Sequence, residues 1–151
     1  MPNTLLSIPH HPQHSDGDCL AACAAMVLEH LGVSVDYHRL LRLLDVKPYG
    51  TPGSHLKNVS DLGVNVSYAL GTLQELLEYL ADGKPSIVLV RTGQLPYWDY
   101  ATDHAVVVVG FDEEAVYVND PAFERAPQRI PQADFELAWM AFDYRYAVIW
   151  R

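Results

Sequence analysis

Residues 18–26 read Asp18-Cys19-Leu20-Ala21-Ala22-Cys23-Ala24-Ala25-Met26. Apolar side chains continue at helical spacing as far as Leu31 and Gly32 supplies a stop, so this stretch predicts a helix from Asp18 to about Leu31. Cys19 then stands at the helix N-terminus, where unpaired backbone N–H groups and the positive end of the helix dipole favour a thiolate over a thiol. Gln13 lies six positions before Cys19 and carries a side-chain amide that could donate to a developing oxyanion. We therefore treat Cys19 as a candidate nucleophile.

The composition is that of one compact protein. The chain has 151 residues, 50% of them hydrophobic and 19% charged, so it can bury a sizeable core, and we expect one domain over residues 1–151. Ten Lys and Arg residues against nineteen Asp and Glu residues give a net charge of −9. That balance argues against nucleic acid or an anionic membrane as the main partner. The N-terminus lacks the pattern of a secretory signal, and no uncharged run approaches the roughly 18 residues of a membrane span. We expect a soluble, cytoplasmic protein.

The first half of the chain is predicted to be mainly helical. After the first helix, the pattern favours a helix at 36–44, a short helix ending at 62, a strand at 64–70 and a helix at 72–81. Ser34 is the expected cap of the second helix. Thr72 and Glu75 have capping-box spacing, and Gly63 closes the short helix.

The second half is predicted to consist mainly of strands. They are expected at 86–90, 105–109, 115–119 and 146–150, with a helix at 132–142. The continuous apolar run of the first of these strands indicates burial on both faces. The acidic residues 112–114 connect the strands at 105–109 and 115–119, which are a candidate hairpin. We therefore predict an α+β fold in which an N-terminal helical half packs on a C-terminal antiparallel sheet.

His104 and Asp120 are the candidates for the base and for the residue that orients it. His104 follows a polar loop and opens a valine-rich strand, while Asp120 ends the next strand and precedes Pro121, which restricts its backbone to extended geometry. The register of the two strands tests this pairing, because two side chains on paired strands share a face only when the register matches. A three-residue hairpin loop places Asp120 on the face of His104. A two-residue loop places it on the opposite face unless a bulge intervenes.

Together these features resemble a known family. Gln13 and Cys19 at their spacing, Asp18-Cys19 opening an Ala-rich helix, the Gly50-Thr51 segment, His104 before valines and Asn119-Asp120-Pro121 are similar to the bacteriocin-processing, double-glycine-type cysteine peptidases of the papain-like superfamily. The resemblance implies a papain-like fold and hydrolysis of a peptide bond, in a leader or a small peptide. It also implies Cys19 as nucleophile, His104 as base and acid, Asp120 as the orienter of His104, and Gln13 as oxyanion donor. No cofactor or metal is expected, and the oligomeric state is unknown.

Several readings stay open beside this one. The same site could perform another acyl transfer, such as deamidation or transpeptidation, or the domain could only bind peptides. A metal site built from Cys19, Cys23 and the N-terminal histidines His10, His11 and His14 is a further alternative. Tyr97 and Trp98, in the loop before His104, are predicted to bind substrate. The carboxylate of Asp18, which would oppose a thiolate, is predicted to turn away and cap the helix.

Overall fold

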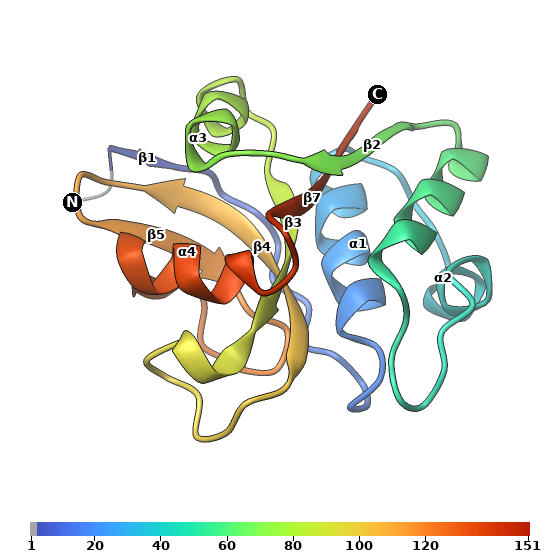
Figure 1. The fold of residues 1–151 in the computed structure, drawn as a ribbon. Coiled ribbons are helices and arrows are strands. Elements are labelled where there is room, and N and C mark those ends of the chain that lie inside the picture. Colours follow the sequence, from blue (N-terminus) through green and yellow to red (C-terminus); the bar gives the residue numbers. More distant parts are fainter. Residues whose placement is uncertain (1–2) are drawn as a thin grey trace.

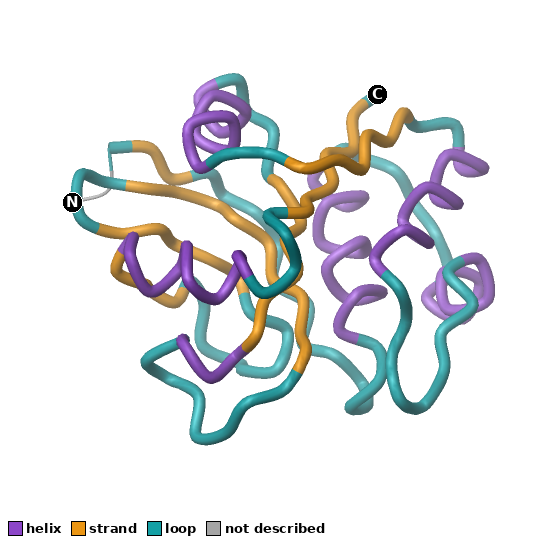
Figure 2. Tube along the Cα trace, in the orientation of Figure 1, coloured by secondary structure: helices purple, strands orange, loops and turns teal. Residues whose placement is uncertain are grey.

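In the computed structural model, which describes residues 3–151, helices lie on both faces of one antiparallel sheet (Figures 1 and 2). The helices are α1 (Cys19–His30), α2 (Tyr37–Leu43), α3 (Leu73–Ala81) and α4 (Gln132–Met140), with the 3₁₀ helices η1 (Gly53–Leu62) and η2 (Thr92–Gln94). The strands are β1 (Thr4–Leu5), β2 (Asn65–Leu70), β3 (Ser86–Arg91), β4 (Asp103–Phe111), β5 (Ala115–Asn119), β6 (Gln128–Pro131) and β7 (Arg145–Trp150). Their order is β2-β7-β3-β4-β5-β6, and β1 pairs with the far end of β4. The predicted α+β class is confirmed.

The central strands are buried on both faces, as their apolar runs predicted. In β4, Val107 and Val109 belong to a core shared with α1, α2 and η1, whereas Val106 and Val108 belong to a second core with α3 and α4. Alternate residues of one strand therefore enter different cores, as the two-residue period of a strand requires. The two cores clamp the sheet between its helical layers, so the ends of its strands are fixed in position.

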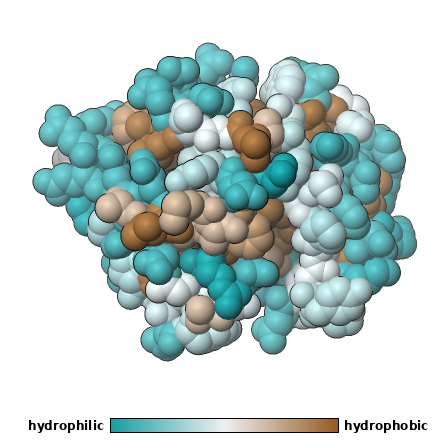
Figure 3. Space-filling view, in the orientation of Figure 1, coloured by the Kyte–Doolittle hydropathy of each residue, from teal (hydrophilic) through white to brown (hydrophobic). Residues whose placement is uncertain are grey.

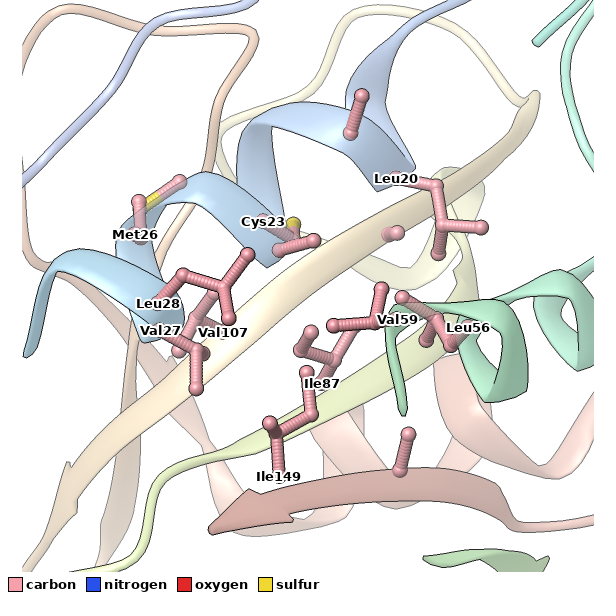
Figure 4. Packing of buried hydrophobic residues seen from close by; sticks show 14 of the residues in the cluster. Leu20, Cys23, Met26, Val27, Leu28, Leu56, Val59, Ile87, Val107 and Ile149 are labelled. Atoms are coloured by element: carbon pink, nitrogen blue, oxygen red, sulfur yellow. The ribbon is translucent and has the colours of Figure 1, made fainter. Parts of the chain in front are cut away.

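α1 packs closely on the sheet because its side chains on that face are small. Its buried residues include Ala21, Ala22 and Ala24, together with the larger Leu20 and Met26. Figure 4 shows Cys23 on the side of α1 that faces β4, among the other buried side chains of this core. The helix ends just before Gly32, which has the positive φ of 75° expected at a stop signal. The predicted helix thus forms with nearly the predicted bounds.

Some local predictions were wrong or incomplete. Asp36, not Ser34, caps α2, and its carboxylate accepts the backbone N–H groups of His38 and Arg39. The two short strands β1 and β6 were not predicted. Thr72 caps α3, since its hydroxyl accepts the N–H of Glu75 at 3.2 Å, which is one of the two bonds of the predicted capping box.

The surface is mixed in character. Figure 3 shows apolar side chains gathered over α4, where Leu137 and Met140 are 46% and 49% exposed. Among residues 3–151 no helix combines the length and the hydropathy that crossing a bilayer requires.

Candidate active site

His104 and Asp120 form a buried pair at one end of the sheet. His104 is the second residue of β4, and Asp120 directly follows β5. Nε2 of His104 lies 2.6 Å from Oδ1 of Asp120, and the two side chains are only 4% and 0% exposed. The structure therefore brings together the two residues predicted to be the base and its orienter.

A β-bulge sets the face on which Asp120 lies. The turn between β4 and β5 has the two-residue form, which alone would send Asp120 to the wrong face. A bulge just before Gly110 adds one residue to β4 and shifts the register. Beyond the bulge Asn119 lies opposite Val107, so the next residue continues the ladder on the face of His104. The prediction of a shared face holds through the bulge and not through a three-residue loop.

Each carboxylate oxygen of Asp120 accepts two hydrogen bonds. Oδ1 also accepts the backbone N–H of Ala122 at 2.9 Å, and Oδ2 accepts the Tyr97 hydroxyl at 2.8 Å and the Trp98 indole N–H at 2.9 Å. Burial alone raises the pKa of this carboxyl, but the hydrogen bonds and the charge of His104 outweigh it and hold the pKa below its ordinary value. Asp120 is thus an anion fixed in one orientation.

Cys19 is the first residue of α1 and borders the same groove as His104. Because Nε2 of His104 is taken by Asp120, the other ring nitrogen, Nδ1, is the one left for the thiol. Burial favours the neutral ring. The hydrogen bonds and charges of Asp120 and Cys19 nevertheless raise the pKa of His104 to about 9. The histidine is therefore cationic at neutral pH and can stabilise a thiolate on Cys19.

Gln13 lies beside the turn that carries Asp120. Its backbone N–H donates to the carbonyl of Pro121 at 2.8 Å. Its side-chain Nε2 donates to the carbonyl of Ser15 at 2.8 Å, while Oε1 is buried and has no partner among the described residues. Gln13 is therefore next to the catalytic candidates, but its amide N–H is engaged locally in this state.

Asp18 turns away from Cys19, as predicted, but it does not cap α1. Its carboxylate accepts the backbone N–H groups of His14 and Ser15 at 3.0 and 2.8 Å and the hydroxyl of Tyr37 at 2.6 Å. Burial raises the pKa of Asp18, but these bonds dominate and lower it below the ordinary value. Asp18 therefore ties the segment that carries Gln13 to α2.

Two grooves meet at His104. The first has a volume of about 740 Å³ and is bordered by Gln13, Asp16, Trp98, Tyr100, His104 and Phe123, among others. The second has a volume of about 470 Å³ and is bordered by Cys19, Leu20, Tyr49, Thr51, Leu89 and His104, among others. An extended peptide lying along both grooves would pass over the candidate nucleophile.

Glycines let the walls of the second groove approach each other. A Cβ on Gly17 would lie 2.4 Å from the carbonyl oxygen of Lys47, and a Cβ on Gly53 would lie 2.5 Å from Cδ1 of Leu89. At Gly17 the close atoms belong to the backbone, so only glycine fits there, whereas at Gly53 the side chain of Leu89 would have to shift.

The proposed metal ligands do not come together. His10 bonds to the carbonyl of Phe123, His11 to Glu29, and the ring of His14 packs on Tyr37 with 4.2 Å between centroids. Cys23 is fully buried, and burial raises its pKa well above the ordinary value of a thiol. In the described part of the chain no three potential ligands gather around a common point.

Sequence reasoning missed two parts of this arrangement. The backbone N–H of Ala122 donates to the side chain of Asp120 and forms an Asx turn. An aspartate at the start of a turn is a known signal for this motif. The contact between Tyr37 and Asp18 joins residues 19 positions apart and has no local signature. Of the two residues predicted to bind substrate, Trp98 borders the first groove, and both donate to Asp120.

Comparison with known proteins agrees with this geometry. The family model described as "Peptidase_C39 like family" matches residues 5–147. No match was found among curated proteins.

Three solved structures share the fold. A protein described as a C39-like peptidase from Bacillus anthracis is 19% identical, with 98% of this chain and 97% of that chain covered and a TM-score of 0.83. A double glycine motif protease from the AMS/PCAT transporter, solved with its leader peptide, is 20% identical over 97% of this chain and 94% of its own, with a TM-score of 0.76. The peptidase domain of Streptococcus ComA is 21% identical over 97% and 96%, with a TM-score of 0.74. At these identities the likeness establishes the fold.

Proposed function

The chain belongs to the Peptidase_C39-like family, and on that premise we propose that it is a cysteine peptidase. In this proposal Cys19 is the nucleophile, His104 is the general base and acid, Asp120 orients His104, and Gln13 donates to the oxyanion. One observation carries the proposal. The buried His104–Asp120 pair lies where two grooves join, and Cys19 borders one of these grooves together with His104.

The first chemical step is attack of the Cys19 thiolate on a peptide carbonyl. The cationic ring of His104 and the uncapped backbone N–H groups at the start of α1 stabilise the thiolate beforehand. The carbonyl oxygen becomes negative as the sulfur–carbon bond forms. In this proposal the backbone N–H of Cys19 and the side-chain amide of Gln13 donate hydrogen bonds to that oxygen. Gln13 must release the carbonyl of Ser15 to serve in this role.

Collapse of the tetrahedral intermediate breaks the carbon–nitrogen bond. His104 passes its proton to the departing amine and leaves a thioester on Cys19. The neutral imidazole then takes a proton from a water molecule, which attacks the thioester and releases the acid product. Asp120 stabilises each cationic state of the ring and keeps its Nε2 engaged, so that Nδ1 carries the proton that moves.

We propose that the substrate is a peptide, and more specifically a leader segment. A structurally similar protease has been solved with its leader peptide. The two grooves together offer space on both sides of the scissile bond.

Thiol labelling tests the proposed nucleophile. We expect iodoacetamide at neutral pH to modify Cys19 and to leave the buried Cys23 unmodified in the folded protein. Cys23→Ala is the matched control, because it removes the other thiol of the same helix and should leave the labelling of Cys19 unchanged. Preferential labelling of Cys23, or none at either thiol, would contradict the proposal.

A peptide-library cleavage assay tests the reaction itself. Cleavage should disappear in Cys19→Ala and in His104→Ala while the circular dichroism spectrum stays unchanged. Product masses separate the alternatives, because hydrolysis splits the chain with gain of one water, whereas deamidation converts an amide to an acid without splitting it. Cleavage at full rate by Cys19→Ala would end the proposal.

A further inference from the structure

The loop between β3 and β4 holds its own shape. The buried Thr92 is bonded to the opposite end of the loop, since its N–H donates to the carbonyl of Thr102 at 2.9 Å and its hydroxyl accepts the N–H of Thr102 at 2.8 Å. The same hydroxyl donates to the carbonyl of Tyr100 at 2.8 Å. These bonds close the loop at its base. The residues at its tip are therefore presented in a fixed geometry.

The tip presents two hydrogen-bond donors to one oxygen. The hydroxyl of Tyr97 and the indole N–H of Trp98 both reach Oδ2 of Asp120, at 2.8 and 2.9 Å. This oxygen is the one that His104 does not use, since the ring is bonded to Oδ1. Without the two donors, a fully buried carboxylate oxygen would lose both of its hydrogen bonds.

The same side chains also enclose the imidazole. The ring of Trp98 meets that of His104 edge-on, with 4.8 Å between centroids. Phe123 packs edge-on against both Tyr97 and Trp98, at 5.1 and 5.3 Å. This aromatic group packs against the pair formed by His104 and Asp120, whose side chains are only 4% and 0% exposed, so water has little access to Oδ2.

We propose that Tyr97 and Trp98 are positioning residues, which fix the Asp120 carboxylate and disperse its charge so that His104 can both hold and release its proton. The proposal rests on the proposed function for its catalytic meaning. It replaces direct substrate binding as the main task of the two side chains. They act on His104 through Asp120 and need not touch the substrate.

The proposal has a defined effect on the proton of His104. A carboxylate that loses a donor is a stronger base, so it holds the imidazolium more tightly and makes it a weaker acid toward the leaving amine. The titratable groups that face the pair are Cys19 and Cys23 from α1 and Tyr97 from the loop. Cys19 and Cys23 are unchanged in the variants used below, so a shift reports on the loop donors.

The first experiment titrates His104 by NMR in Tyr97→Phe and in Trp98→Phe. Each change keeps an aromatic ring and removes one donor. We expect the midpoint of His104 to move to higher pH by about half a pH unit or more. In an Asp120→Asn background the donors no longer face a carboxylate whose basicity they can lower. The same changes should therefore not move the midpoint of His104.

Two control variants separate positioning from general effects. Tyr117→Phe removes a hydroxyl that donates to Asp112 at 2.7 Å, a bond of the same kind outside the site. Trp139→Phe removes a buried indole N–H that donates to the carbonyl of Arg145 at 2.7 Å. Both controls can lower the melting temperature, but neither should move the midpoint of His104.

The second experiment measures cleavage kinetics. We expect kcat to fall about tenfold in Tyr97→Phe or Trp98→Phe with KM unchanged, as loss of one hydrogen bond to a charged group implies. An unchanged midpoint of His104, an equal shift in the Asp120→Asn background, or a change confined to KM would each overturn the proposal. The titration needs no substrate. A failed peptidase assay in the unmodified protein would therefore count against the proposed function and leave this inference to be decided by NMR.

Discussion

Replacing Asp120 by Asn should reverse the way in which folding stability depends on pH. In the folded protein the pKa of His104 is raised to about 9, against an ordinary value of 6.5. The folded state therefore keeps a proton that the unfolded chain releases between these two values. A group of this kind contributes its full stability below pH 6.5, and the contribution is lost as the pH rises through about 9.

The magnitude follows from the difference between the two pKa values. It corresponds to about 3 kcal/mol of unfolding free energy, lost between pH 6.5 and pH 9. The asparagine side chain keeps the shape of Asp120 but removes the charge that holds the proton on His104. Burial then dominates, since it favours the neutral ring, and the pKa of His104 in the variant should fall below 6.5.

Urea unfolding at a series of pH values between about 5.5 and about 10 tests this sign change, because both limits lie about one pH unit outside the window. For the unmodified protein we expect the unfolding free energy to fall with pH above 6.5. For Asp120→Asn we expect it to rise with pH up to 6.5 and then to level off. Parallel curves for the two proteins would refute the reasoning, because they would show that Asp120 does not hold the proton of His104.

Three further predictions follow from other contacts. Gln13→Ala should lower kcat by about a hundredfold with little change in melting temperature, and an unchanged kcat would exclude Gln13 as oxyanion donor. Gly110→Ala should lower the melting temperature, because its Cβ would lie 2.6 Å from the carbonyl oxygen of Thr4, and a melting temperature equal to that of the unmodified protein would contradict this. Tyr37→Phe should cost about 2 kcal/mol of unfolding free energy at pH 7. That cost should shrink as the pH falls through the lowered pKa of Asp18, and urea titrations at neutral and acid pH would show it.

The sequence predicted the parts of the fold that repeat a pattern over many residues. The helix at α1 and the buried strands β3 and β4 have long apolar runs whose period decides their type. β6 escaped prediction because only Ile130 of its four residues is fully buried. β1 is only two residues long and depends on the end of β4 for its pairing.

The features of the candidate site could likewise be predicted only in part. Cys19, His104 and Asp120 could be found because each stands at the end of a well-marked element. The bulge before Gly110 could not, because a run of four valines gives no sign of where an extra residue will be placed. The carboxylate of Asp18 was expected to follow the local rule for helix caps, but a tertiary contact with Tyr37 competes for it and prevails.

The bulge in β4 also determines which changes of chain length this hairpin can accept during evolution. Extra residues added at the turn lie beyond the bulge, so they lengthen the loop and leave the order of faces near Asp120 intact. One residue gained or lost within β5 would send the carboxylate to the opposite face of the sheet, whereas two would restore it. Relatives that keep this pair should therefore differ in the turn by any number of residues, but in the strand only by even numbers.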